Sequence, residues 1–227
     1  QKRSEMEKKI DAHVLSTPEE ETESVERLSK YLTSSYEGER SKAYAIFRWL
    51  SFHVSYDVDG FFGRTEKKSS DPESVLKHKL CVCAGYANLF EALGKEAGLK
   101  VHTIEGYAKG YGYEPGKRFT TANHAWNAVQ INGEWFISEP TWGAGFLGND
   151  LLFHRSPNPA MFLMDPEYAI CSRYPLDENW QLLDQSITKE EFETFVVPSA
   201  GIHELGVELL RHKEIIYNFD EDHAEMT

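Results

Sequence analysis

The chain has 227 residues, of which 41% are hydrophobic and 13% aromatic, so it can bury a sizeable core. Its formal net charge is −13, with 37 acidic against 24 basic residues. A nucleic-acid-binding surface needs basic side chains to replace the counterions of phosphate, and an anionic membrane also attracts basic segments. The charge balance therefore argues against both kinds of partner.

Neither a membrane span nor a secretion signal is predicted. No apolar run approaches the ~18–20 residues that cross a bilayer, and residues 1–13 lack the apolar stretch of a signal peptide. The three cysteines are Cys81, Cys83 and Cys171. A low, odd number argues against a disulfide framework and fits a reducing compartment. We therefore expect a cytoplasmic protein.

The first third of the chain is predicted to be mainly helical. Residues 1–20 form a charged arm, and apolar residues then recur at helical spacing from Val25 to Leu32. A longer helix with a broad apolar face is expected from Ala43 to His53. Asp71 followed by Pro72 is typical of a capped helix start, which predicts a further short helix.

The next helix has the clearest amphipathic pattern. Its apolar positions recur at i, i+3, i+4, i+7 and i+11 and form one stripe: Tyr86, Leu89, Phe90, Leu93 and Ala97. Gly98 lies where a C-terminal cap is expected. Cys83 lies at the N-terminal end of this helix.

After this helix the sequence pattern changes to that of strands. Strands are predicted for Val101–Tyr107, His124–Ile131 and Glu134–Ser138, and Asn132-Gly133 is the signal for a tight hairpin turn. Helices thus precede a small antiparallel sheet, and the expected fold class is α+β.

The expected domain organisation has three parts. A core at 39–183 follows a charged, helical extension at 1–38. Residues 184–227, with a helix near 189–195, are either a C-terminal extension or the start of a further domain.

Cys83 is the candidate nucleophile. A thiol reacts poorly near neutral pH unless its pKa is lowered, and the N–H groups and dipole of a helix N-terminus favour the thiolate. The small residues Ala84 and Gly85 would let a substrate approach closely. The alternative is a buried structural cysteine, which is common.

His124 and Glu139 are predicted neighbours. If Asn132-Gly133 forms a two-residue turn, Trp126 lies opposite Glu139, and His124 is two residues further along the same face. A carboxylate bound to one ring nitrogen fixes the tautomer of a catalytic histidine, as in a triad. The alternatives are an ordinary core or surface histidine and a solvated carboxylate at a strand end.

Other kinds of site are less well supported. Cys81 and Cys83 form a C-x-C pair with His78 nearby, but a zinc site normally has four ligands at wider spacing. Asp57 and Asp59 are not followed by the remaining ligands of a calcium loop. Residues 106–110 are glycine-rich but precede no helix, so they do not form a phosphate loop. No metal or cofactor is expected.

Three blocks of sequence resemble the conserved blocks of the transglutaminase-like superfamily of papain-like cysteine enzymes. They are Val82-Cys83-Ala84-Gly85-Tyr86-Ala87, His124-Ala125-Trp126-Asn127-Ala128-Val129 and Trp135-Phe136-Ile137-Ser138-Glu139-Pro140-Thr141-Trp142. Within this superfamily, the chain further resembles the branch that contains kyphoscoliosis peptidase and hillarin-type proteins. The segments that carry this resemblance are residues 44–50, 56–57, 141–145, 162–167, 180–183 and 188–192.

The resemblance implies a papain-like core and thiol acyl transfer on protein amides, either peptidase or protein-glutamine acyltransferase chemistry. Cys83, His124 and Glu139 would form the triad. The oxyanion would be held by the Cys83 N–H and a second donor. The candidates for oxyanion or substrate contacts are Trp49, His53, Ala84, Trp126 and Trp142. Protein or peptide substrates, cytoskeletal partners and a cytoplasmic, cytoskeleton-associated location are implied as well.

One position departs from the family pattern, because the third block usually has Asp where this chain has Glu139. An extra methylene displaces the carboxylate, and an error of ~1 Å can lower a tuned activity about 100-fold. The alternative function is therefore a weak or inactive member that acts as a cytoskeletal adaptor. A peptide N-glycanase-like amidase is less well supported, because the C-x-x-C zinc pairs of those enzymes are missing.

Overall fold

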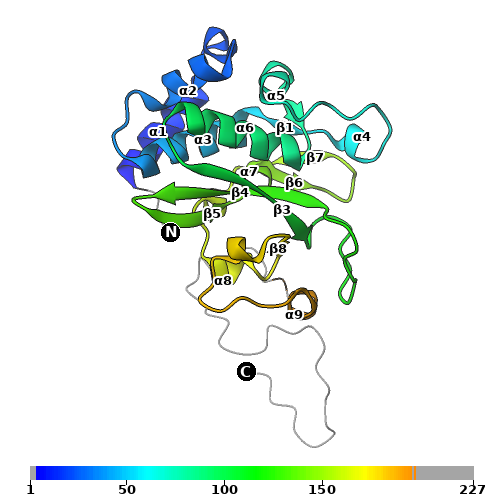
Figure 1. Cartoon of the computed structure of the whole chain (residues 1–227). Coiled ribbons are helices and arrows are strands. Elements are labelled where there is room, and N and C mark those ends of the chain that lie inside the picture. Colours follow the sequence, from blue (N-terminus) through cyan, green and yellow to red (C-terminus); the bar gives the residue numbers. More distant parts are fainter. Residues whose placement is uncertain (1–3, 196, 198–227) are drawn as a thin grey trace, which may run out of the picture.

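The structure, a computed structural model, describes residues 4–195 and residue 197. Helices come first and an antiparallel sheet follows, which confirms the α+β class (Figure 1). The α-helices are α1 (Glu5–Leu15), α2 (Val25–Thr33), α3 (Glu39–His53), α4 (Val58–Phe61), α5 (Pro72–His78), α6 (Cys83–Glu96), α7 (Pro140–Ala144), α8 (Pro166–Ala169) and α9 (Lys189–Thr194). The strands are β1 (Ser55–Tyr56), β2 (Leu80–Cys81), β3 (Val101–Ala108), β4 (His124–Ile131), β5 (Glu134–Ser138), β6 (Gly145–Leu147), β7 (Phe153–Arg155) and β8 (Arg173–Pro175).

The main sheet has the strand order β5-β4-β3-β8, with antiparallel neighbours throughout. The β4–β5 hairpin has the predicted register, because Ile131 pairs with Glu134 across a two-residue turn. Asn132 and Gly133 have φ values of 53° and 90°, which is the left-handed backbone that such a turn requires. The turn therefore sets which residues of β4 and β5 share a face.

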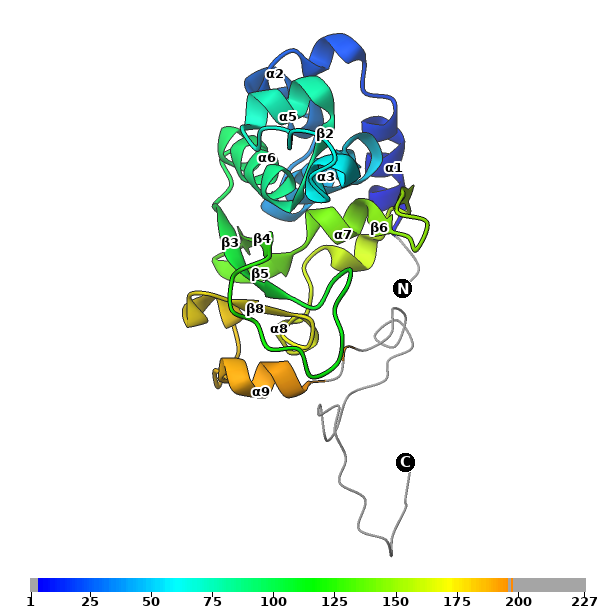
Figure 2. The same cartoon turned by 90° about the vertical axis from the view of Figure 1, so that its right-hand side faces the viewer.

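The sheet lies between two groups of helices (Figures 1 and 2). Helix α6 packs on β3 and β4, with α2, α3 and α5 around it, while α8 and α9 lie on the opposite side. The two sides have separate buried clusters: Leu89, Leu93 and Val129 belong to the first, and Ile104, Trp126 and Met164 to the second. Because both faces of the sheet are covered, six of the eight residues of β4 are buried, the polar Asn127 among them.

The first two helices share the core of the chain. Ile10 and Leu28 belong to the same buried cluster as α3 and α6. Arg48 of α3 also makes two hydrogen bonds, of 2.7 and 3.2 Å, to the buried Asp11 carboxylate. Helices α1 and α2, which lie within the predicted extension at 1–38, therefore pack against this core with their apolar faces.

Several predicted helix boundaries are confirmed. The Asp71 side chain accepts the Ser74 N–H at the start of α5, and α9 occupies Lys189–Thr194. Residue 196 and residues 198–227 of the predicted C-terminal extension lie outside the described residues. Within residues 4–195 and 197, no helix combines the length and apolar character needed to cross a bilayer.

Candidate active site

Cys83 is the first residue of α6, as predicted. The N-cap residue, Val82, offers no side-chain cap, so no side chain occupies the first-turn N–H groups beside the thiol. A Cβ on Gly85 would lie 2.4 Å from the Cβ of Cys81. Gly85 is therefore required for the packing of α6 on β2, and the expectation that it opens the site to substrate is corrected.

His124 begins β4, and the residue before it is firmly held. Asn123 donates a hydrogen bond of 3.0 Å to the Ala108 carbonyl and accepts one of 2.7 Å from the Ala108 N–H. The side chain of His124 is only 8% exposed, and its ring stacks on Trp126 and Trp142 at centroid distances of 6.1 and 5.2 Å. The orientation of the imidazole is thus set by its neighbours in strand and loop.

Glu139 uses its two carboxylate oxygens for different tasks. Oε1 accepts the N–H groups of Thr141 and Trp142, at 3.1 and 3.3 Å, and so caps α7. Oε2 accepts a hydrogen bond of 2.8 Å from Nε2 of His124. The predicted neighbours are therefore brought together, and the glutamate side chain reaches the histidine despite its extra methylene.

The electrostatics of these groups favour a thiolate–imidazolium pair. Burial acts to raise the pKa of Cys83, but hydrogen bonding to His124 and the charge of that ring outweigh it, so the pKa is lowered. Burial acts to lower the pKa of His124, but Glu139 and the Cys83 thiol raise it to about 9. Since Nε2 of His124 is bound to Glu139, Nδ1 remains for the thiol.

A second cation, Arg173 of β8, approaches the same carboxylate. Its Nε lies 3.6 Å from Oε2 of Glu139, and both side chains are buried. Burial acts to raise the pKa of Glu139, but His124, Arg173 and the Trp142 N–H together lower it. The carboxylate is thus kept ionised between two cations.

β8 can lie beside β3 only because of Gly106. A Cβ at Gly106 would lie 2.1 Å from the Tyr174 carbonyl oxygen. Sequence reasoning did not identify Arg173 as a site residue, and no motif in the sequence signals it.

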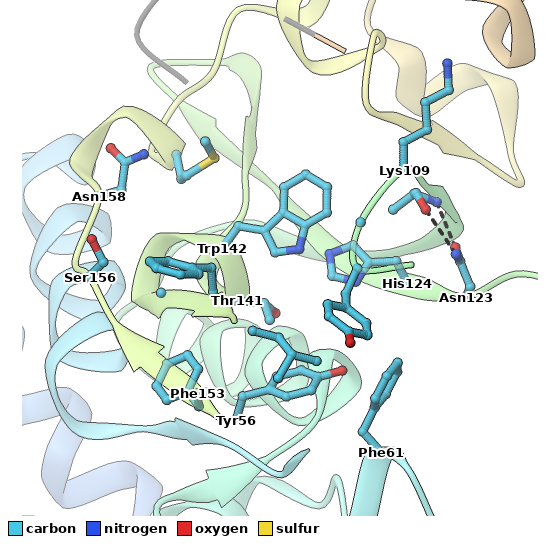
Figure 3. A pocket seen from close by; sticks show the side chains of 17 residues that line it. Tyr56, Phe61, Lys109, Asn123, His124, Thr141, Trp142, Phe153, Ser156 and Asn158 are labelled. Carbon is cyan, nitrogen blue, oxygen red and sulfur yellow. Dashed lines mark hydrogen bonds between the residues drawn. The ribbon is translucent and has the colours of Figure 1, made fainter. Parts of the chain in front are cut away.

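A cavity of about 620 Å³ opens beside His124 (Figure 3). It is lined by residues of β1, α4, α7, the 109–123 loop and the β6–β7 hairpin. Arg155 fixes this hairpin by donating hydrogen bonds to the carbonyls of Ser51 and Val54. The position and size of the cavity are those of a ligand-binding cleft.

The five predicted oxyanion or substrate residues have different surroundings. Trp142 lines the cavity, and Trp126 is buried in the cluster on the far side of the sheet while stacking on His124. Ala84 is half-buried in the first turn of α6 and is not among the cavity-lining residues. Trp49 and His53 stack on each other within the helical layer, and a ring nitrogen of His53 is 2.8 Å from the Val14 carbonyl oxygen.

Trp49 and His53 are not among the residues that line the cavity, so their predicted oxyanion role stays a prediction. Tyr56, which sequence reasoning did not assign to the site, does line it (Figure 3). Burial raises the pKa of Tyr56, and the adjacent Cys83 raises it further.

Within the described residues no group of three or more His, Cys, Asp or Glu side chains is arranged to hold a metal. Cys81 is fully buried, and its pKa is raised by burial first and by Cys83 second. Its surroundings are those of a packed structural thiol.

The fold and this site define the class of the protein. Residues 16–140, more than half of the chain, match the model of the transglutaminase-like superfamily, and the chain belongs to that superfamily.

Two curated relatives extend this result. Mouse kyphoscoliosis peptidase is 33% identical over 172 residues, which cover 75% of this chain and 26% of the relative. Hillarin of Drosophila melanogaster is 30% identical over 197 residues, which cover 81% of this chain and 24% of the relative. The chain thus spans about a quarter of the length of these relatives. A solved structure of a TGase is 17% identical, with a TM-score of 0.41 over 58% of this chain and 32% of that chain.

Proposed function

We propose that this chain is a cysteine enzyme that acts on protein amides by thiol acyl transfer. The observation that carries the proposal is the 2.8 Å bond between His124 and Glu139, made on the ring nitrogen that leaves the other free for Cys83. A buried, ionised carboxylate stabilises the imidazolium, and the imidazolium stabilises the thiolate.

The first half of the reaction forms an acyl-enzyme. The Cys83 thiolate attacks the amide carbonyl and forms a C–S bond. The protonated His124 then gives its proton to the departing amine as the C–N bond breaks. Cys83 and His124 are left as a thioester and a neutral imidazole.

The second half releases the acyl group. His124 takes a proton from the incoming water or amine while that nucleophile attacks the thioester carbonyl. The C–S bond breaks, and the thiolate–imidazolium pair is restored. With water the products are those of hydrolysis, and with an amine a new amide forms. The name of the mouse relative, a peptidase, supports water as the acceptor.

The oxyanion formed in both halves needs hydrogen-bond donors. The N-terminus of α6 has no side-chain cap, so the backbone N–H of Cys83 is the first donor we propose. The Tyr56 hydroxyl is the second, because it shares the cavity with His124 and lies close enough to Cys83 for the thiolate charge to raise its pKa.

The other proposed function is that of a binding protein with little or no turnover, attached to cytoskeletal proteins in the cytoplasm. The strongly acidic composition supports it, since basic partners would be attracted to such a surface. Both functions use the same fold, so chemistry at Cys83 separates them.

The test compares the three cysteines of the chain. The protein is treated with limiting iodoacetamide, and each cysteine peptide is quantified by mass spectrometry. We expect Cys83 to react faster than a free cysteine at the same pH, whereas Cys81 and Cys171, both fully buried, should react slowly. Equal reaction of all three thiols, or partner binding that survives Cys83→Ala with no turnover in either form, would favour the binding protein.

A further inference from the structure

Large aromatic rings make up a substantial part of the lining of the cavity beside His124. Seventeen residues line it, and those with large aromatic side chains, His124 aside, are Tyr56, Phe61, Tyr111, Trp142, Phe146 and Phe153. Figure 3 shows rings from β1, α4, α7 and β7 around one opening, with the His124 ring at its edge. Any substrate held for attack beside His124 therefore places some of its atoms against aromatic surface.

No charged side chain other than His124 points into this cavity. The chain has 37 acidic residues, yet neither Asp nor Glu is among the lining residues. Lys109 is the single Lys or Arg there, and its ammonium donates hydrogen bonds to the carbonyls of Phe192 and Phe195. Figure 3 shows the Lys109 side chain directed away from His124. A charged substrate side chain would lose water in this cavity, and the charged group it would meet there, His124, is already paired with Glu139.

The apolar surface continues onto the rim of the cavity. Phe61 is 45% exposed, Tyr111 46% and Phe146 58%, although large apolar side chains are usually buried. The rings of Tyr56, Phe61, Phe62 and Tyr111 form a chain of edge-to-face contacts, with centroids 5.1 to 5.8 Å apart, from β1 to the 109–123 loop. A continuous exposed apolar surface of this kind marks a binding site.

We infer that the cavity selects peptide segments with a large apolar or aromatic side chain within a few residues of the reacting amide, and discriminates against acidic and basic side chains there. The inference rests on the proposed acyl-transfer function and specifies its substrate. The volume of about 620 Å³ exceeds that of one side chain, so the cavity also has room for neighbouring backbone.

The test uses peptidyl chloromethyl ketones, in which the electrophile replaces the reacting amide. Each of the three residues before the electrophile is changed in turn from alanine to phenylalanine, leucine, glutamine, glutamate or lysine. The rate of Cys83 alkylation is measured for each compound. We expect phenylalanine or leucine to be favoured over glutamate and lysine by about 10-fold or more at one position at least, as burial of a large apolar side chain implies. Equal rates at all three positions, or a preference for a charged or glutamine side chain, would overturn the inference.

A variant of the rim provides a matched comparison. Phe146→Lys places a cation at the cavity, so it should lower the rate with the phenylalanine compound and raise the rate with the glutamate compound. Leu176→Lys is the control, because Leu176 is 52% exposed and does not line the cavity. If both variants change the preference equally, or if neither does, the cavity is not the selecting surface.

A binding measurement separates failure of this inference from failure of the proposed function. Cys83→Ala protein is titrated with the corresponding unreactive peptide amides while tryptophan fluorescence is followed, since Trp142 lines the cavity. If Cys83 reacts with no compound faster than free cysteine does, acyl transfer is excluded, and the titration still decides whether the cavity prefers aromatic peptides. If Cys83 reacts quickly without any preference, acyl transfer stands and the selectivity does not.

Discussion

Nε of Arg173 lies 3.6 Å from Oε2 of Glu139, and the two side chains form a buried ion pair behind His124. Arg173 also donates to the sulfur of Met164 at 2.9 Å and lies over the Trp142 ring, 4.6 Å from its centroid. Its remaining donors, Nε and Nη2, have no hydrogen-bond partner. Burying the Arg173 guanidinium with unpaired donors costs desolvation energy. In return, the guanidinium places a positive charge beside the Glu139 carboxylate.

Replacement of Arg173 should therefore affect both stability and the site. Arg173→Met leaves the buried Glu139 with one cation, and we expect a loss of about 3 kcal/mol in the free energy of unfolding, measured with urea. The pKa of Glu139 should rise. As the pH is lowered, the rate of Cys83 alkylation should therefore begin to fall at a higher pH than in the parent protein. Arg173→Lys keeps the charge and should restore most of the pH profile. An unchanged pH profile in Arg173→Met would show that Arg173 has only a packing role.

Glu139→Gln tests the carboxylate itself. The amide keeps the shape of the side chain but removes its charge, so the pKa of His124 should fall from about 9 towards its usual value. We expect amide turnover to fall about 10³-fold or more, as for the equivalent change in a serine triad. Glu139→Asp is the companion variant. Its shorter side chain cannot both cap α7 and reach His124, and we expect a loss of about 100-fold. Aspartate activity equal to that of glutamate would contradict the dual role.

The pH dependence of reactivity follows from the two perturbed groups. Cys83 should be a thiolate below the usual pKa of a thiol, because its pKa is lowered. His124 should remain protonated until the pH rises through about 9. We therefore expect iodoacetamide to label Cys83 faster than a free cysteine at every pH below the usual pKa of a thiol, and amide turnover to decline above about pH 9. A labelling profile that follows an ordinary thiol pKa would contradict the ion pair.

Stability should also depend on His124. Its pKa is raised on folding, so its contribution is complete below its ordinary pKa of 6.5 and is lost as the pH rises through about 9. The Cys83→Ala background isolates the bond to Glu139. There, the pKa of His124 is still raised by Glu139 but no longer by the Cys83 thiol, so the free energy of unfolding should fall as the pH rises above 6.5, and the fall should be complete at a lower pH than in the parent protein. The further change His124→Gln should remove most of that fall. Parallel pH profiles for the two proteins would exclude this contribution.

Tyr56→Phe tests the proposed second oxyanion donor. The variant keeps the ring that packs against Phe61 and removes only the hydroxyl. We expect turnover to fall about 100-fold, with KM and iodoacetamide labelling nearly unchanged, because the donor acts on the oxyanion. Tyr111→Phe is a matched control, since Tyr111 also lines the cavity. Equal effects of the two changes would exclude the specific role of Tyr56.

Local signals were sufficient to predict much of this molecule. Asn132-Gly133 has the backbone that a two-residue turn requires, so the register of β4 and β5 and the proximity of His124 to Glu139 followed from the sequence. The amphipathic stripe of α6 likewise placed Cys83 at its N-terminus. These features depend on interactions between residues that are close in sequence.

Tertiary features were not predictable in this way. Arg173 reaches Glu139 because β8 pairs with β3, and a three-residue strand has no periodicity to detect. Trp49 and His53 follow the helical pattern of α3, which predicts a helix but not its neighbours. The surroundings of these two side chains are set by α1 and the rest of the core, which are distant in sequence. The aromatic cavity is assembled from segments between β1 and β7 that are far apart in the chain.

The bonds between Lys109 and the last turn of α9 join the mouth of the cleft to a distant part of the chain. A protein cut before Lys189 would lack both carbonyl acceptors. A buried ammonium without acceptors is unfavourable, so the Lys109 side chain would turn to water or into the opening. A helix more than 60 residues beyond His124 thus helps to hold the charge of Lys109 outside the cleft.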